Sequence, residues 1–224
     1  MHVPDGFIGG AVSAGAGVAA VAGLGIAVKR AGAQLDDRRA PLTGLVAAFV
    51  FAAQMVTVPI AAGTSGHLIG GVLAAVLVGP WAGAICLAVV VVVQALFADG
   101  GLTALGLNLV NLSLVTTLGG YGAFAVLHAL LPKRRGALPL AAGISAGVSV
   151  VMAAAAFAAE YALGGRGGAD PGAVFAAMTG VHVLVAVGEG VVTAGAVGAL
   201  LAVRPDLVYA AGREEAAVMV ERPA

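Results

Sequence analysis

The chain has 224 residues, of which 61% are hydrophobic and 10% are charged, and its mean hydropathy is +1.06. Soluble globular domains carry about 25% charged residues, so this composition excludes an ordinary soluble protein and indicates an integral membrane protein. Eleven basic residues balance eleven acidic ones, which excludes the strongly basic surface typical of nucleic-acid binding.

Long apolar runs cross a bilayer as α-helices, because the helix satisfies its own backbone hydrogen bonds in lipid. Taken in chain order, these runs and their glycine and proline punctuation predict an all-α membrane protein with seven transmembrane spans, in one domain covering residues 1–224. The spans are expected at about 7–28, 42–60, 67–79, 81–98, 102–131, 138–160 and 173–203.

The third and fourth spans have a second interpretation, as one helix over residues 67–98 bent at Pro80, because proline beside glycine either kinks a helix or turns the chain. Basic charge favours two spans. With seven spans and the amino terminus outside, ten of the eleven basic residues lie inside, including Lys133-Arg134-Arg135, and only Arg166 lies outside. The positive-inside rule therefore predicts seven spans and a cytoplasmic carboxyl terminus.

Met1-His2 opens the chain with a terminal amine followed directly by histidine. The amine, the backbone nitrogen of His2 and its imidazole Nδ1 can close two fused rings around one metal ion. This nitrogen set suits Ni(II), Cu(II) and Co(II), whereas Mg²⁺ and Ca²⁺ prefer oxygen ligands. Taken alone, the pair is also an ordinary start for a protein.

Three polar segments are expected at the outer face: Met1-His2, Gly63–His67 and the turn Asp99–Gly101. Because the third span is short, Gly63–His67 is expected to dip into the membrane as irregular backbone, which is tolerated only where it is buried in protein or lines a cavity. His67 is therefore the predicted fourth nitrogen donor.

Other polar residues have two interpretations each. Asn108 lines the site or bonds between helices, and Asp99 caps the following helix or orients an imidazole. His182 and Glu189 lie seven residues apart on one face of the last span; they support the site without binding the metal, or hold helices together. His128 is expected to be structural.

Gly44, Ala48 and Ala52 form a stripe of small residues on the second span, which would let a partner helix approach closely. In an alanine-rich chain such stripes also arise by chance. No HExxH or Walker A motif is present in the sequence, so we expect no enzyme activity, and any ATP hydrolysis that drives transport would come from separate subunits.

Six segments, in this order over nearly the whole chain, resemble the CbiM/NikM family: MHVPDGFIGG, FAAQMVTVP, GTSGHLIGG, GPWAG, QALFADGGLTALGLN and VGEGVVTAG. Its members are the substrate-capture (S) components of energy-coupling factor (ECF) transporters for cobalt and nickel. The resemblance implies seven transmembrane helices and a metal site built from the terminal amine, the amide and imidazole of the second residue, and the histidine of GTSGH. These positions are Met1, His2 and His67 in this chain.

The resemblance also implies partners: a transmembrane coupling (T) subunit, paired cytoplasmic ABC ATPases and, in many cases, a small accessory membrane protein. It places the chain in the cell membrane of a prokaryote, with Co²⁺ or Ni²⁺ as transported ligand and no catalytic cofactor. The sequence does not separate the two metals. Two other hypotheses use the same residues: a membrane metalloenzyme or metal sensor, although catalytic sites keep an open coordination position, and a structural membrane subunit whose glycine loops only pack.

Overall fold

The computed structural model of the protein describes residues 1–33, 39–61, 64–97, 99–132, 134 and 136–212. Gly63, Lys133 and Arg135, on which the sequence argument drew, lie outside the described residues. The elements are α1 (Gly10–Gly32), α2 (Arg39–Gln54), β1 (Val58–Ala61), β2 (Thr64–Gly66), α3 (Gly71–Val78), α4 (Pro80–Leu96), α5 (Leu105–Asn108), the π-helix η1 (Leu109–Gly119), α6 (Gly120–Leu130), α7 (Ala137–Gly164), α8 (Pro171–Val203) and the short 3-10 helix η2 (Pro205–Leu207).

Four helical stretches are long and apolar enough to cross a membrane: α1, the continuous stretch Leu105–Leu130, α7 and α8. Large apolar side chains along them, such as Val21 and Leu184, are exposed rather than buried. A soluble protein rarely exposes so much apolar surface. The chain is therefore a mostly helical membrane protein, as its composition predicts.

The second expected span, 42–60, is wrong at its carboxyl end. Helix α2 ends at Gln54, and β1 then pairs antiparallel with β2. Pro59 explains the change, because the residue before a proline avoids helical backbone angles. The segment expected to be irregular accordingly includes a strand, and His67 follows that strand, ahead of α3.

The chain turns at Gly79 and does not continue as one bent helix. Gly79 adopts a φ of +93° between the end of α3 and the first residue of α4. A β-carbon at Gly83 would lie 2.9 Å from the backbone nitrogen of Ala75, so the two helices fold back on each other at close range. All eight residues of α3 are buried, which makes this helix part of the core rather than of the lipid-facing surface.

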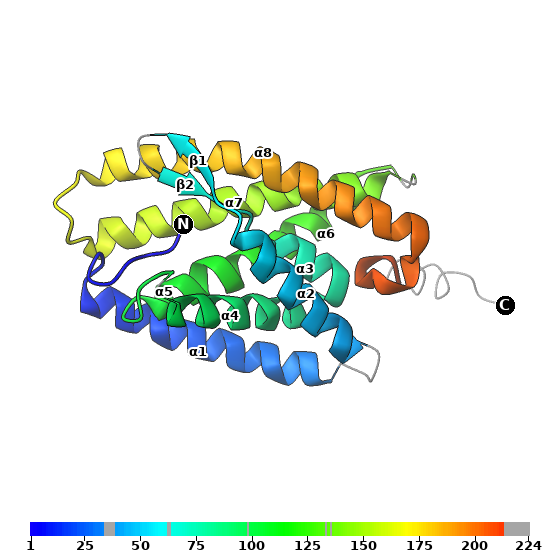
Figure 1. Cartoon of the computed structure of the whole chain (residues 1–224), viewed down its shortest axis with the longest axis horizontal. Helices are drawn as coiled ribbons and strands as arrows, with labels where there is room; N and C mark the ends of the chain where they lie inside the picture. Colours follow the sequence, from blue (N-terminus) through cyan, green and yellow to red (C-terminus); the bar gives the residue numbers. More distant parts are fainter. Residues whose placement is uncertain (34–38, 62–63, 98, 133, 135, 213–224) are drawn as a thin grey trace.

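Residues 1–9 are fixed at one end of the molecule, where the turn between α4 and α5 and the turn between α7 and α8 also lie (Figure 1). The backbone N–H of Gly9 donates to the carbonyl of Gly164 at 2.7 Å, and that of Gly101 donates to the carbonyl of Val3 at 2.9 Å. η2 lies at the opposite end (Figure 1). The amino-terminal residues are therefore tied to both turns and have a defined position.

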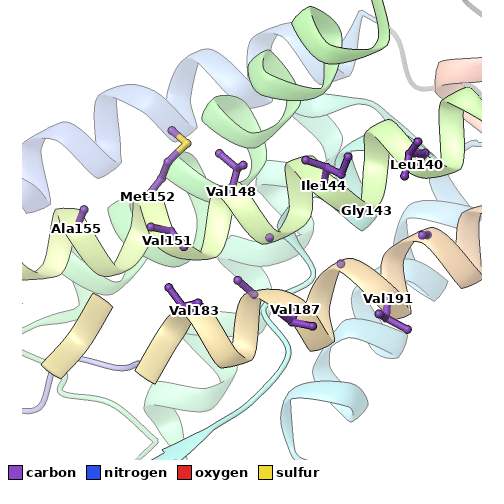
Figure 2. Close-up of a pocket in the computed structure, with 14 residues that line it drawn as sticks. Leu140, Gly143, Ile144, Val148, Val151, Met152, Ala155, Val183, Val187 and Val191 are labelled. Carbon is purple, nitrogen blue, oxygen red and sulfur yellow. The ribbon is translucent and has the colours of Figure 1, made fainter. Parts of the chain in front are cut away.

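Helices α7 and α8 pack closely because small residues face each other at their contact. A β-carbon at Gly143 would lie 2.7 Å from the carbonyl oxygen of Gly190. Beside this contact runs an apolar groove of about 760 Å³, with side chains from both helices along it (Figure 2). Its lining includes Ile144, Val148, Met152, Val183, Val187 and Val191.

Candidate metal centre

The structure brings His2 and His67 together, although they lie far apart in the sequence. Their rings stack with 5.2 Å between centroids and an interplanar angle of 25°. Both line a pocket of about 460 Å³ together with Met1, Asp99 and Gly100. The predicted nitrogen donors thus share one pocket at the end of the molecule where the amino-terminal segment is fixed.

A chain of hydrogen bonds decides which nitrogen of His2 is free. Nε2 of Gln54 donates to the carbonyl of Ile69 at 2.7 Å, and Nε2 of Gln94 donates to Oε1 of Gln54 at 2.7 Å. Oε1 of Gln94 then faces Nε2 of His2 at 3.1 Å. Because a carbonyl only accepts, the whole chain has one direction, so His2 donates through Nε2 and keeps the lone pair on Nδ1.

His67 is held in the complementary way. Its Nδ1 donates to the carbonyl of Leu68 at 2.9 Å, while its Nε2 is buried with no hydrogen-bond partner among the described residues. A buried polar atom without a partner is costly, whereas a histidine whose other nitrogen donates to a carbonyl has the arrangement usual for a metal ligand. Each imidazole therefore presents one unprotonated nitrogen.

The terminal amine of Met1 lies close enough to influence both imidazoles electrostatically. Burial lowers the pKa of this amine from 8.0 to about 6, against the opposing effect of the Asp99 carboxylate. Burial also lowers the pKa of His2. At neutral pH the amine is therefore mostly uncharged, which leaves its lone pair available for a metal ion.

Asn108 holds the first residues in place, and Asp99 lies beside them. Oδ1 of Asp99 lies 3.4 Å from Nδ1 of His2, and the carboxylate places negative charge where a bound cation would sit. Oδ1 of Asn108 accepts from the backbone N–H of Val3 at 2.7 Å, and its Nδ2 donates to the carbonyl of Val3 at 3.1 Å. The structure does not give Asp99 the capping role, because α5 begins without a side-chain cap; its role beside the imidazole of His2 stays a prediction.

Gly100 is required by this arrangement for two reasons. Its φ is +104°, a conformation that favours glycine, and a β-carbon there would lie 3.2 Å from Cδ2 of His2. Next to it, Oδ1 of Asp5 accepts from the backbone N–H of Thr103 at 2.7 Å and from its hydroxyl at 2.5 Å. Asp5, rather than Asp99, is thus the aspartate that bonds to the turn ahead of α5.

His182 and Glu189 bond to different segments despite sharing a helix face. Nδ1 of His182 donates to the carbonyl of Met178 at 2.7 Å, and the side chain lines a cavity of about 280 Å³ with Met1 and His2. The carboxylate of Glu189 accepts from the backbone N–H groups of Ile69 and Gly70, each at 2.6 Å. His182 thus borders a cavity that Met1 and His2 also line, whereas Glu189 bonds to the segment that follows His67.

The small-residue stripe on α2 lies on the surface. Gly44, Ala48 and Ala52 are all exposed, and a β-carbon at Gly44 would meet no atom within 4 Å. The stripe is therefore available to a partner and does not take part in the metal centre.

For Gln54 and Gln94 the sequence leaves two interpretations open, hydrogen bonding between helices and lining of the site. Both are almost completely buried, in helices that are otherwise apolar. A buried glutamine in such a helix needs hydrogen-bond partners, and this is the signal that would have marked them. Among the described residues, no group of three or more His, Cys, Asp or Glu side chains is placed to hold a metal ion, so a metal here would need the main-chain nitrogens of the first two residues.

Comparison with known proteins shows which family the chain belongs to. The sequence profile of CbiM, described as the cobalt uptake substrate-specific transmembrane region, matches residues 2–207. The chain belongs to the CbiM family. The family resemblance expected from the sequence motifs is thus confirmed.

Relatives of this CbiM-family chain extend over most of its length. A protein of Haloquadratum walsbyi is 37% identical over 93% of this chain and 94% of its own length. The cobalt transport protein CbiM of Sorangium cellulosum is 40% identical over 75% of this chain and 76% of that protein. A crystal structure of a transition metal transporter shares 31% identity and a TM-score of 0.83, covering 91% of this chain and 93% of the other.

Proposed function

We propose that this CbiM-family protein is the metal-binding S component of an ECF-type ABC transporter that imports Co²⁺ or Ni²⁺. Four nitrogens would capture the ion: the Met1 amine, the His2 amide, Nδ1 of His2 and Nε2 of His67. The observation that carries this proposal is the pair of stacked imidazoles. One ring nitrogen of each is engaged in a hydrogen bond, and both residues line the pocket of the amino terminus.

Binding would release protons, because a metal-bound amide nitrogen must lose its hydrogen and the amine and imidazoles must be unprotonated. The pKa values of the amine and of His2 are lowered in the metal-free protein. At neutral pH these two groups therefore have few protons to lose when the metal binds. Asp99 would offset part of the positive charge of the ion. Release would require residues 1–9 to move relative to the two turns that hold them.

In the membrane, the chain would cross seven times with the amino terminus outside and the carboxyl terminus in the cytoplasm. The pocket would then open toward the medium from which the metal is captured. Transport would be driven by a T subunit and cytoplasmic ATPases in the cell membrane of a prokaryote. A metalloenzyme or sensor with the same ligands is less well supported, because the named relatives with known roles are transport proteins.

The exposed stripe on α2 is the proposed docking surface for the T subunit. Ala48→Leu should weaken assembly of the transporter, measured by co-purification of the T subunit and ATPases, and should leave Ni²⁺ affinity of the isolated chain unchanged. Loss of affinity with intact assembly would instead make the stripe part of internal packing.

The terminal amine provides the test that is specific to the proposed chelate. A Gly-Ser extension before Met1 converts this buried amine into an amide while both imidazoles remain. We expect Ni²⁺ and Co²⁺ affinity to fall at least about 100-fold, beyond the upper end of losses measured for residues that only support metal ligands. Mass spectrometry would verify that the extension is retained. Wild-type affinity in the extended protein would contradict the chelate.

A further inference from the structure

Glu189 is a carboxylate in the middle of α8 that is almost completely buried. Its two oxygens accept from the backbone N–H groups of Ile69 and Gly70, both at 2.6 Å. These residues immediately precede α3, whose first N–H groups have no partner within the helix and form its positive end. A buried carboxylate at this point is therefore matched by two hydrogen bonds and a helix dipole.

The backbone that Glu189 holds, at Ile69 and Gly70, follows His67 by only two and three residues. On its other side, the carbonyl of Ile69 accepts from Nε2 of Gln54 at 2.7 Å. Gly70 has a φ of +81°, and a β-carbon there would lie 3.0 Å from Cγ2 of Val50. The segment between β2 and α3 is thus held from α8 on one side and from α2 on the other, with little space to shift.

The same peptide is also the end of the hydrogen-bond chain from His2. That chain runs through Gln94 and Gln54 to the carbonyl of Ile69. The supports of both imidazoles therefore meet at Ile69. A displacement of Ile69 would move His67 directly and would disturb the tautomer of His2 through the glutamines.

We infer that Glu189 is a positioning residue for the metal centre: by holding the backbone of Ile69 and Gly70, it fixes where Nε2 of His67 meets the ion. This inference rests on the proposed function. Glu189 contacts no proposed ligand atom, so its effect on metal binding passes through His67 and, through the glutamines, His2. It also connects the long helix α8 to a site built mainly from other elements.

The test uses the purified full chain and Ni²⁺ alone, with affinity measured by calorimetry. In Glu189→Gln, the amide group can accept one of the two N–H bonds but faces the other with a donor. We expect about tenfold weaker binding, within the range found for residues that support metal ligands. Glu160→Gln is the matched control, because Glu160 is a carboxylate on α7 that bonds to Nδ2 of Asn111 at 2.7 Å and has no link to Ile69. Its affinity should equal that of the wild type.

A double-mutant cycle separates positioning from a general loss of stability. If Glu189 acts through His67, Glu189→Gln should change affinity much less in a His67→Ala background than in the wild type. The visible absorption spectrum of the Ni²⁺ complex should also shift in Glu189→Gln, because the ligand geometry changes. Equal losses in both backgrounds, or an unchanged spectrum with wild-type affinity, would overturn the inference.

A second variant covers the case in which Glu189→Gln does not fold. Glu189→Asp keeps the charge but shortens the side chain, so it cannot hold both N–H groups and should also weaken Ni²⁺ binding, whereas wild-type affinity in this variant would overturn the inference. Absence of Ni²⁺ and Co²⁺ binding by the wild-type chain would refute the proposed function itself. The two failures are therefore distinguishable.

Discussion

Two pockets in this molecule differ in size and in chemistry, and the proposed function rests on the smaller one. The groove between α7 and α8 has about 760 Å³ and is lined by aliphatic side chains and glycines (Figure 2). The pocket at the amino terminus has about 460 Å³ and is lined by two histidines, Met1 and the two aspartates Asp5 and Asp99. Volume alone would have selected the groove, whereas the candidate nitrogen ligands line the smaller pocket.

The difference lies in what each lining can bind. Hydrocarbon side chains offer only dispersion and the exclusion of water, and inside a bilayer lipid tails satisfy such a groove equally well. The amino-terminal pocket instead is lined by the imidazoles of His2 and His67, whose protonation is set by hydrogen-bond partners such as Gln94. Only the second lining can select one ion from another.

Among substitutions that test the two pockets against each other, His67→Ala should reduce Ni²⁺ affinity most, because it removes one of the four proposed nitrogen ligands. Ni²⁺ affinity should fall between about tenfold and 100-fold or more, since even residues that only support metal ligands cost that much. The matched control is His128→Ala, because His128 is a histidine on α6 that stacks on Phe124 and lines neither pocket. Equal losses at the two positions, measured by calorimetry, would show that the pocket is not the metal site.

Acidification should reduce the affinity in two regimes. Above the amine pKa of about 6, binding displaces mainly the amide proton, so affinity should fall about tenfold per pH unit. Below that pKa the amine is protonated in the free protein, so a second proton is displaced and the dependence should approach about 100-fold per unit. Titrations from pH 8 to 5 would locate the change in slope. A break near pH 8, the ordinary value for an amine, would mean that the amine is not buried.

A smaller effect is expected from Gln94→Leu, which keeps the side-chain volume but removes the acceptor for Nε2 of His2. The imidazole could then place its proton on Nδ1, and we expect about tenfold weaker Ni²⁺ binding. Gln94→Glu restores an acceptor and should recover part of the affinity. An unchanged affinity in Gln94→Leu would show that the hydrogen-bond chain does not govern the tautomer.

The smallest effect is expected in the apolar groove. Val187→Leu alters an exposed side chain of α8 away from every nitrogen of the pocket. Metal affinity should stay within about twofold of the wild type, as for other surface substitutions. A larger change would mean that the groove and the pocket are coupled, and the comparison between them would fail.

The sequence alone predicted the membrane class and the family, and it named the three residues of the proposed metal centre. Hydropathy can be read from short stretches of sequence. Three of the four nitrogens of the proposed chelate belong to the adjacent residues Met1 and His2, so they are close together in any fold. Six motifs in order along the chain, one of them around His67, indicated the family. The sequence also predicted the turn at Gly79 through charge, because two spans place Lys133 and its neighbours on the same side as the first loop.

Only the tertiary structure decided which atoms of these residues are free and what holds them. Gln54, Gln94 and Ile69 lie on separate segments, so the direction of their hydrogen bonds, and with it the tautomer of His2, depends on packing between helices. Asp99 had two local interpretations, and its distance from His2 separates them. Glu189 follows no periodic pattern that points to α3, because its partners are backbone N–H groups, which every residue except proline carries and which only the fold can bring to it.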